Sequence, residues 1–226
     1  MSQFVLSIFS GIGLLDRAFR DAGFVVVSAG DLILGKHYDI RDFLGIKGKF
    51  DGIIGGPPCP DFSSLKRDRP GLEHSYGFEM LMEFKRIVEE CDPTWYLLEN
   101  VRGVPDVFID GFTHQRIDIN QGWFEAVTRL RHIQFGHKDQ KYLQIERGVI
   151  DQDQKKYESC ALANDSRSFR DLCRLQGLED DFDLPNFTVK GKKRAVGNGV
   201  PLSMGRALAS AVLELEHLDV TLNAMS

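Results

Sequence analysis

Short apolar segments alternate with amphipathic stretches through the first half of the chain. The apolar segments are rich in β-branched and aromatic residues, which is typical of strands, whereas the amphipathic stretches have helical spacing. Strands are expected over Phe4–Phe9, Phe24–Ala29, Phe50–Ile54 and Trp95–Glu99, and helices over Leu14–Ala22 and Gly77–Cys91. This alternation predicts an α/β fold with a mostly parallel sheet and helices on both of its faces.

The second half of the chain has fewer regular patterns. Leu130–Phe135 and Tyr142–Ile145 predict two neighbouring strands joined by the polar turn Gly136–Lys141. Leu202–Leu215 is rich in alanine and leucine and predicts a helix. The length of 226 residues and the lack of an internal repeat or linker favour a single domain over residues 1–226.

The composition excludes several classes of protein. The four cysteines, Cys59, Cys91, Cys160 and Cys173, form no Cys-x-x-Cys pair, so neither a zinc site nor a disulfide framework is expected. His132 and His137 lack acidic or cysteine ligands at a suitable spacing, and we expect no metal. The chain shows no leader pattern and no apolar run of the roughly 20 residues that span a bilayer, so we expect a cytoplasmic protein with no membrane contact.

The formal net charge of −5 argues against nucleic-acid binding, because phosphate contacts depend on lysine and arginine. Two local runs are nevertheless basic: Lys66, Arg67 and Arg69 in one, and Lys190, Lys192, Lys193 and Arg194 in the other. Each run fits a solvated face as well as it fits a contact with phosphates.

One cysteine follows directly after a predicted strand. The segment Phe50–Pro60 reads Phe-Asp-Gly-Ile-Ile-Gly-Gly-Pro-Pro-Cys-Pro and delivers Cys59 at the carboxyl end of that strand. Ligands of open α/β sheets bind at this edge, so Cys59 is a candidate nucleophile. A small buried apolar residue is the alternative that this segment alone leaves open.

A glycine-containing turn follows the first predicted strand and leads at once into a helix. In Phe9-Ser10-Gly11-Ile12-Gly13-Leu14, the glycines allow a tight turn and close approach of a ligand to the backbone. The free N–H groups of the following helix also suit a nucleoside cofactor. Asp31, after the second strand, stands where an acidic residue accepts hydrogen bonds from ribose, and Asp39-Ile40 could serve an adenine.

Further motifs complete a recognisable order along the chain. They are Glu99-Asn100-Val101, Leu175-Gln176-Gly177 and Gly197-Asn198-Gly199-Val200, which follow the glycine turn and Gly56-Pro57-Pro58-Cys59. In this order the set resembles the DNA (cytosine-5) methyltransferase family, and the resemblance extends over almost the whole chain.

The resemblance implies a Rossmann-like fold that binds S-adenosyl-L-methionine as cofactor. The implied cofactor contacts are Phe9, Ser10, Gly11, Ile12, Gly13, Leu14, Asp31, Asp39, Ile40, Pro57, Asn198 and Val200. It also implies a DNA substrate whose cytosine is flipped out of the duplex, because the reacting atoms are inaccessible within the base stack. Cys59 would attack C6 of that cytosine while Glu99 stabilises a proton on N3. The implied phosphate contacts are Ser63, Lys66, Arg67 and Arg69.

The chain departs from the family's pattern in two places. The family's Gln-x-Arg-x-Arg element, whose arginines help to hold the flipped cytosine and its phosphate, cannot be aligned cleanly. We favour Arg131 as the catalytic substitute, and the alternative is that the arginines here only flank a strand. The target-recognition domain is reduced to a vestigial region over residues 148–167, which offers few side chains for reading bases, so we expect low or short sequence specificity. The stretch Arg102–Gln121 is either a substitute DNA contact or an ordinary surface loop.

Alternatives remain open at this point. A cytosine-5 methyltransferase acting on RNA or on single strands would carry the same motifs, and so would a DNA-binding subunit that needs a separate recognition partner. The sequence does not distinguish a restriction-modification enzyme from a phage-protection enzyme or an orphan enzyme of a bacterial or phage-infected cell. It also does not indicate the oligomeric state.

Overall fold

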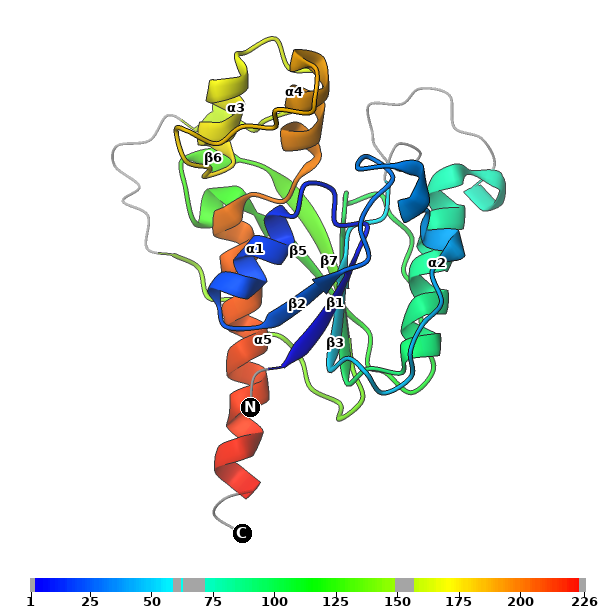
Figure 1. Ribbon diagram of the computed structural model, residues 1–226. Helices are drawn as coiled ribbons and strands as arrows, with labels where there is room; N and C mark the ends of the chain where they lie inside the picture. The colour runs from blue at the N-terminus through cyan, green and yellow to red at the C-terminus, as the bar shows by residue number, and fades with distance from the viewer. Residues whose placement is uncertain (1–2, 59–61, 63–71, 149–156, 224–226) are drawn as a thin grey trace.

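The computed structural model describes residues 3–58, 62, 72–148 and 157–223. Its centre is a six-stranded sheet with the order β2-β1-β3-β4-β7-β5 (Figure 1). The strands are β1 (Phe4–Ile8), β2 (Val25–Ser28), β3 (Gly52–Gly55), β4 (Trp95–Asn100), β5 (Gln115–Asn120) and β7 (Leu130–His137). Strands β1 to β4 are parallel, and β7 lies antiparallel between β4 and β5, so five strands run in one direction.

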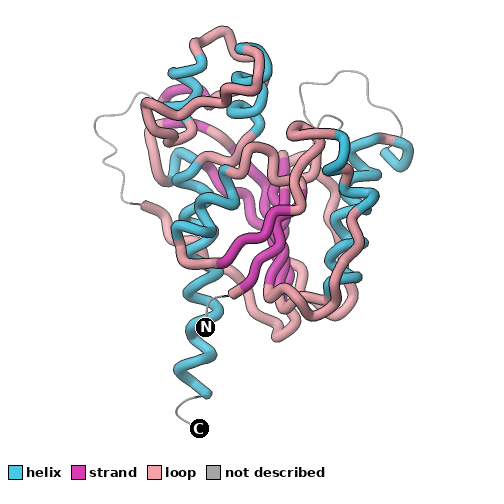
Figure 2. Tube along the Cα trace, in the orientation of Figure 1, coloured by secondary structure: helices cyan, strands magenta, loops and turns pink. Residues whose placement is uncertain are grey.

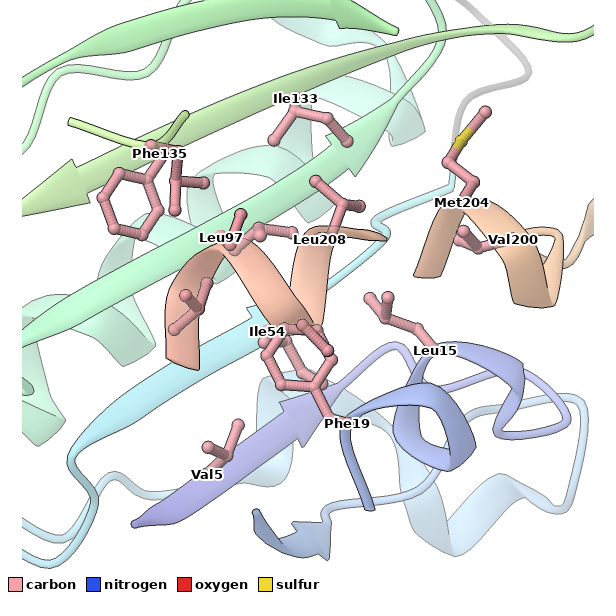
Figure 3. Close-up of a cluster of buried hydrophobic side chains, with 14 of the residues drawn as sticks. Val5, Leu15, Phe19, Ile54, Leu97, Ile133, Phe135, Val200, Met204 and Leu208 are labelled. Carbon is pink, nitrogen blue, oxygen red and sulfur yellow. The ribbon is translucent and has the colours of Figure 1, made fainter. Parts of the chain in front are cut away.

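Helices cover both faces of the sheet, as Figure 2 shows. Helices α1 (Leu14–Asp21) and α5 (Leu202–Asn223) lie against one face, and α2 (Tyr76–Cys91) lies against the other. Alternate strand residues point to opposite faces, so Ile54 packs with α5 in the first core cluster and Ile53 packs with α2 in the second. Figure 3 shows the first cluster.

A smaller lobe lies beyond the carboxyl ends of the parallel strands (Figure 1). It contains β6 (Val127–Thr128), β8 (Glu158–Ser159), α3 (Phe169–Leu175) and α4 (Val189–Asn198). Its buried cluster includes Leu14 of α1 and Leu202 of α5, so the lobe shares side chains with the main body. Four short 3₁₀ helices complete the described elements: η1 (Lys36–Tyr38), η2 (Ile40–Asp42), η3 (Leu72–His74) and η4 (Gln121–Trp123).

Local signals account for several helix boundaries. Ser75 caps α2 by accepting a hydrogen bond from the backbone N–H of Phe78 at 3.2 Å. Ser168 and Asp171 form a capping box at the start of α3. The long helix begins at Leu202 as predicted and extends beyond the predicted end to Asn223. Among the described residues, no helix combines the length and the apolar character needed to cross a bilayer.

Two expectations for the chain after β4 differ from the structure. Tyr142–Ile145 is not a strand, because β4 and β5 occupy both edges of β7. The side-chain amide of Gln115 instead holds Leu143 through two hydrogen bonds to its backbone, of 2.7 and 2.9 Å. The stretch Arg102–Gln121 is not simply a surface loop, because it contains strand β5.

Candidate active site

The turn after β1 has an unusual backbone. Phe9, Gly11 and Gly13 have φ angles of 54°, 56° and 77°, all in the left-handed region. The N–H of Gly13 donates to the carbonyl of Ser10 at 2.8 Å, which closes the turn just before α1 begins. The tight turn predicted from the two glycines is therefore present. Phe9 is a third residue in the left-handed region, and the sequence did not indicate it.

Asp31 joins this turn to the end of β2. Its Oδ2 accepts a hydrogen bond from the N–H of Gly11 at 3.0 Å, and its Oδ1 accepts one from Ile33 at 2.9 Å. A Cβ atom built on Gly11 would meet no atom within 4 Å among the described residues. The carboxylate of Asp31 thus fixes the backbone of the turn, while the side of Gly11 on which a Cβ would stand is open.

A cleft lies beside this turn, at the carboxyl ends of β1, β2 and β3. It is lined by Phe9, Gly30, Asp31, Leu32, Tyr38, Ile40, Pro58, Tyr76 and Met80. Three of these residues, Phe9, Asp31 and Ile40, are among those predicted for the cofactor. Tyr38, Tyr76 and Met80 were missed, because nothing in their local sequence indicates that the fold brings them to this edge.

Other predicted cofactor residues lie around the cleft without lining it. Asp39 caps η2 and binds Arg41, whose hydrogen bonds lower the pKa of the Asp39 carboxyl to about 2. The Ser10 hydroxyl accepts a hydrogen bond from Ser28 at 3.0 Å. Ile12 packs against the buried cluster of the small lobe, and Pro57 is buried.

Residues from the glycine turn and from the junction of α4 and α5 meet inside the protein. The side chain of Leu14 is buried, and its Cδ1 lies 2.7 Å from the position that a Cβ on Gly199 would take. Val200 is buried in the first core cluster, and Asn198 is exposed at the end of α4. The side chains of Leu14 and Val200 therefore face the core, so any cofactor contact from them would come from their backbone.

Glu99 is a buried carboxylate near the end of β4, with 7% of its surface exposed. Its Oε1 forms an ion pair with Nε of Arg131 at 2.8 Å, although no described donor is aligned with that oxygen as a hydrogen bond. A Cβ on Gly56 would lie 3.0 Å from Oε2, so the carboxyl group lies against the end of β3. Burial raises the pKa of Glu99, and Arg131 and Arg129 partly oppose this shift.

Most of the segment that carries the predicted nucleophile lies outside the described residues, which include Pro58 before Cys59 and Phe62 after it. Cys59, Ser63, Lys66, Arg67 and Arg69 lie outside the described residues. On one side, Nδ2 of Asn100 donates to the carbonyl of Pro57 at 3.0 Å. On the other, the side chain of Phe62 is buried in the second core cluster. Asn100 therefore has a structural hydrogen-bonding role.

Arg129 is a functional candidate that was not singled out from the sequence. It is buried and donates to the carbonyls of Ala161, Gly197 and Gly199 at 2.6, 2.9 and 3.1 Å. Burial and the neighbouring Arg131 lower the pKa of the Arg129 guanidinium. Arg129 and Arg131 preserve the Arg-x-Arg spacing of the family's element, with Val127 where the family has glutamine, and this spacing was the available signal.

Gln176 explains why two of the sequence motifs occur together. Its buried side-chain amide donates to the carbonyls of Val196 and Gly199 at 2.5 and 2.8 Å. Its own carbonyl accepts from the N–H of Leu202 at 3.0 Å. The Leu-Gln-Gly motif therefore fixes the Gly-Asn-Gly-Val segment, and Gly199 receives hydrogen bonds from both Gln176 and Arg129.

The buried histidines are paired with carboxylates. Nδ1 of His132 lies 2.9 Å from Asp118, and Nε2 of His137 lies 2.9 Å from Glu216. Over the part of the chain that the structure describes, no three His, Cys, Asp or Glu side chains form a group that could hold a metal ion.

Comparisons with known proteins point in one direction. Residues 30–107 match the family model described as C-5 cytosine-specific DNA methylase. The chain is similar to Type II methyltransferase M.FnuDI of Fusobacterium nucleatum, with 37% identity over 114 residues, covering 44% of this chain and 33% of that protein. Similarity to Type II methyltransferase M.NgoPII of Neisseria gonorrhoeae is 32% over 117 residues, with the same coverage. The chain thus spans about a third of the length of these curated relatives.

The structural similarity extends further along the chain. The Dnmt2 methyltransferase of S. pombe superimposes with a TM-score of 0.67 at 16% identity, covering 94% of this chain and 98% of that one. The predicted Rossmann-like methyltransferase fold is therefore confirmed.

Proposed function

We propose that the chain transfers a methyl group from S-adenosyl-L-methionine to C5 of cytosine in DNA, starting from the match of residues 30–107 to the C-5 cytosine-specific DNA methylase model. The observation that carries the proposal is the position of Glu99. A carboxyl group with a raised pKa lies against the strand end that leads to the only cysteine of the Gly-Pro-Pro-Cys motif. With an acid and a nucleophile at the same edge of the sheet, the acid can protonate a ring nitrogen while the nucleophile attacks a ring carbon.

The described residues fit the cofactor. The open space in front of Gly11 allows a ligand to approach the backbone, and the adjacent cleft has aromatic and apolar walls with a single carboxylate, Asp31. This combination suits a nucleoside, with Asp31 near the ribose hydroxyls and Ile40 near the base. When bound, S-adenosyl-L-methionine supplies an electrophilic methyl group.

The chain's own residues account for the remaining chemistry. The target cytosine leaves the stack, and the thiolate of Cys59 forms a bond to C6 while Glu99 donates a proton to N3. C5 becomes nucleophilic and takes the methyl group. Loss of the proton from C5, breakage of the bond between sulfur and C6 and return of the N3 proton to Glu99 then give 5-methylcytosine, free Cys59 and the protonated acid.

Arg131 has two opposing effects in this scheme. Its guanidinium holds the Glu99 carboxyl in place through the 2.8 Å ion pair, which orients the acid. The same positive charge lowers the pKa of Glu99 and limits the shift caused by burial. We assign Arg131 to positioning and tuning the acid, a role that differs from the predicted contact with the flipped cytosine and its phosphate.

We assign low or short sequence specificity to the enzyme. In the described part of residues 148–167, the regular structure is the two-residue strand β8. Reading several base pairs in a groove takes several side chains on an element that fits the groove. Either the chain recognises few bases, or a separate partner contributes the recognition.

The test is nucleoside mass spectrometry of unmethylated duplex DNA incubated with S-adenosyl-L-methionine and the protein. The native chain should form 5-methylcytosine, and Cys59→Ala should form none. Cys91→Ala is the matched control, because Cys91 ends α2 at the opposite edge of the sheet.

Each other outcome has a defined meaning. Product with Cys59→Ala would refute the covalent mechanism. If the native chain leaves duplex DNA unmethylated but methylates tRNA or single strands, the proposed duplex-DNA substrate would be refuted and the proposed methyl transfer to cytosine would be retained. Activity on duplex DNA that appears only with a second protein would identify a partner-dependent subunit.

A further inference from the structure

An open groove of about 480 Å³ lies on the small lobe, away from the cleft beside Gly11. It is lined by Ala163, Asn164, Asp165, Val189, Lys190 and Lys193. One wall is therefore the first part of α4, and the other is the loop that precedes α3. The basic run of α4 has no role in the function proposed above.

The charges of this groove are positive and uncompensated. Lys190 and Lys193 form no ion pair with any described residue. Lys192, between them, is used internally, because its Nζ pairs with Asp183 at 2.5 Å and lies over the ring of Phe169. Two lysines of the run thus remain for an external ligand.

The one acidic side chain in the groove is already neutralised. Asp165 accepts from Nε of Arg167 at 2.9 Å and from Nη2 of the same arginine at 2.6 Å. These hydrogen bonds lower the pKa of Asp165, which keeps the pair charged and internally balanced. An anion that enters the groove therefore meets two free cations and a compensated carboxylate.

The two walls are fixed to one another. A Cβ on Gly197 would overlap the backbone of Leu162, so α4 packs directly on the opposite loop. Arg129 also joins the walls, since it donates to Ala161 on one side and Gly197 on the other. The lysines are consequently presented from a rigid support rather than from a flexible arm.

The groove also lies on the same side of the molecule as the active site. Helix α4 stands beyond the carboxyl edge of the sheet, where β3 and β4 end (Figure 1). Arg129 and Arg131 are two residues apart, so the arginine that joins the groove walls is next to the arginine that contacts Glu99. A nucleic acid bound at Glu99 carries phosphates on both sides of the reacting base.

We propose that this groove is a second nucleic-acid contact, in which Lys190 and Lys193 bind backbone phosphates of the substrate. The inference rests on the proposed function and names a site for its substrate outside the segment around Cys59. The contact is independent of sequence, because it reaches phosphates and no base. It supplies affinity that a chain of net charge −5 does not gain from its overall charge.

The experiment is a salt titration of duplex binding by the native chain and by Lys190→Gln/Lys193→Gln. The control is Lys47→Gln/Lys49→Gln, which removes the same charge at the amino end of β3. The logarithm of the association constant falls linearly with the logarithm of the salt concentration. Each lost phosphate contact should make that slope less steep by about 0.9. We expect the groove variant to lose nearly two units of slope and about tenfold or more in affinity at low salt, with the control close to native.

Binding is measured without methyl transfer, so the two proposals fail separately. Equal losses in the groove variant and the control would overturn the inference, because only net charge would then matter. No duplex binding by the native chain would overturn it as well. A loss confined to the groove variant supports it whether or not the DNA becomes methylated, while unchanged kcat at saturating DNA would assign the lysines to binding alone.

Discussion

Glu99 shows how one residue can serve both the fold and the chemistry. Its carboxyl is buried at the edge of the core, where an ionised group is costly, and Arg131 compensates part of that cost. The two influences on its pKa oppose each other, and burial is the larger. The acid therefore stays protonated to a higher pH than an exposed glutamate does.

Glu99→Gln should reduce methyl transfer by about 10²- to 10⁴-fold, because the amide cannot give a proton to N3. Since the pKa of Glu99 is raised, native activity should fall as the pH rises through that value and the proton is lost. The variant should lack this decline. Single-turnover rates across a pH series would test both points.

The exposed Glu89→Gln is the control for this substitution, because Glu89 pairs only with Lys85 on the surface of α2 among the described residues. It should retain the native rate and the native pH profile. A decline with pH that persists unchanged in Glu99→Gln would assign it to another group, such as Cys59.

At the scale of elements, the turn after β1 and the junction of α4 with α5 act as rigid parts with different purposes. The turn leaves open space in front of Gly11, whereas the junction around Gly199 is closed by hydrogen bonds from Gln176 and Arg129. The open turn can accept a ligand, whereas the closed junction stabilises the structure beside it.

Gly11→Ala and Gly48→Ala form a matched pair. Both glycines have a left-handed φ, of 56° and 67°, and a Cβ at either position meets nothing within 4 Å. Each substitution should cost about 1 kcal/mol of stability through backbone strain. Only Gly11→Ala should weaken S-adenosyl-L-methionine binding, as measured by calorimetry, because its methyl group enters the space proposed for the cofactor. Equal affinities would place the cofactor elsewhere.

Gln176→Leu should destabilise the fold by about 1–3 kcal/mol, because it leaves buried carbonyls of the 196–199 segment without a donor. Urea unfolding measures this change. Gln144→Leu replaces an exposed glutamine and should change stability by less than about 0.5 kcal/mol. Similar values for the two variants would show that Gln176 does not support the junction.

At the scale of the whole molecule, the parallel half of the sheet was predictable and the antiparallel half was not. Strands β1, β3 and β4 are largely buried and read as apolar runs, and the edge strand β2 is mostly exposed but is a run of valines, so composition alone identified all four. Strand β5 was missed, because its exposed edge carries polar residues. Its partner β7 was found, but the choice between pairing with β5 and with residues 142–145 depends on contacts that no local pattern encodes.

The site divides in the same way. Glu99 lies at the end of one strand and Asp31 follows another, so their common edge could be inferred from the parallel order. Arg129 and Gln176 act through backbone carbonyls far away in the sequence, and a donor's distant partners cannot be read from its neighbours. The cleft residues Tyr38, Tyr76 and Met80 were likewise brought together only by the fold.

The small size of the recognition region leads to a prediction for the molecule as a whole. Bisulfite sequencing of fully reacted DNA should show methylation at sites of fewer than four base pairs, because few side chains are available to read bases. Native protein alone and native protein with a candidate partner form the comparison. A strict site of four or more base pairs with the chain alone would contradict the prediction.

Phe9 illustrates a compromise between stability and function. A phenylalanine with a φ of 54° stores strain that a glycine would release, yet Phe9 lines the cleft. Phe9→Gly would relax the backbone while removing that part of the cleft lining, although glycine also gains freedom in the unfolded chain. The protein thus accepts backbone strain at a position that lines the ligand cleft. Selection for thermal stability alone would favour replacement of Phe9 and with it the loss of that part of the cleft.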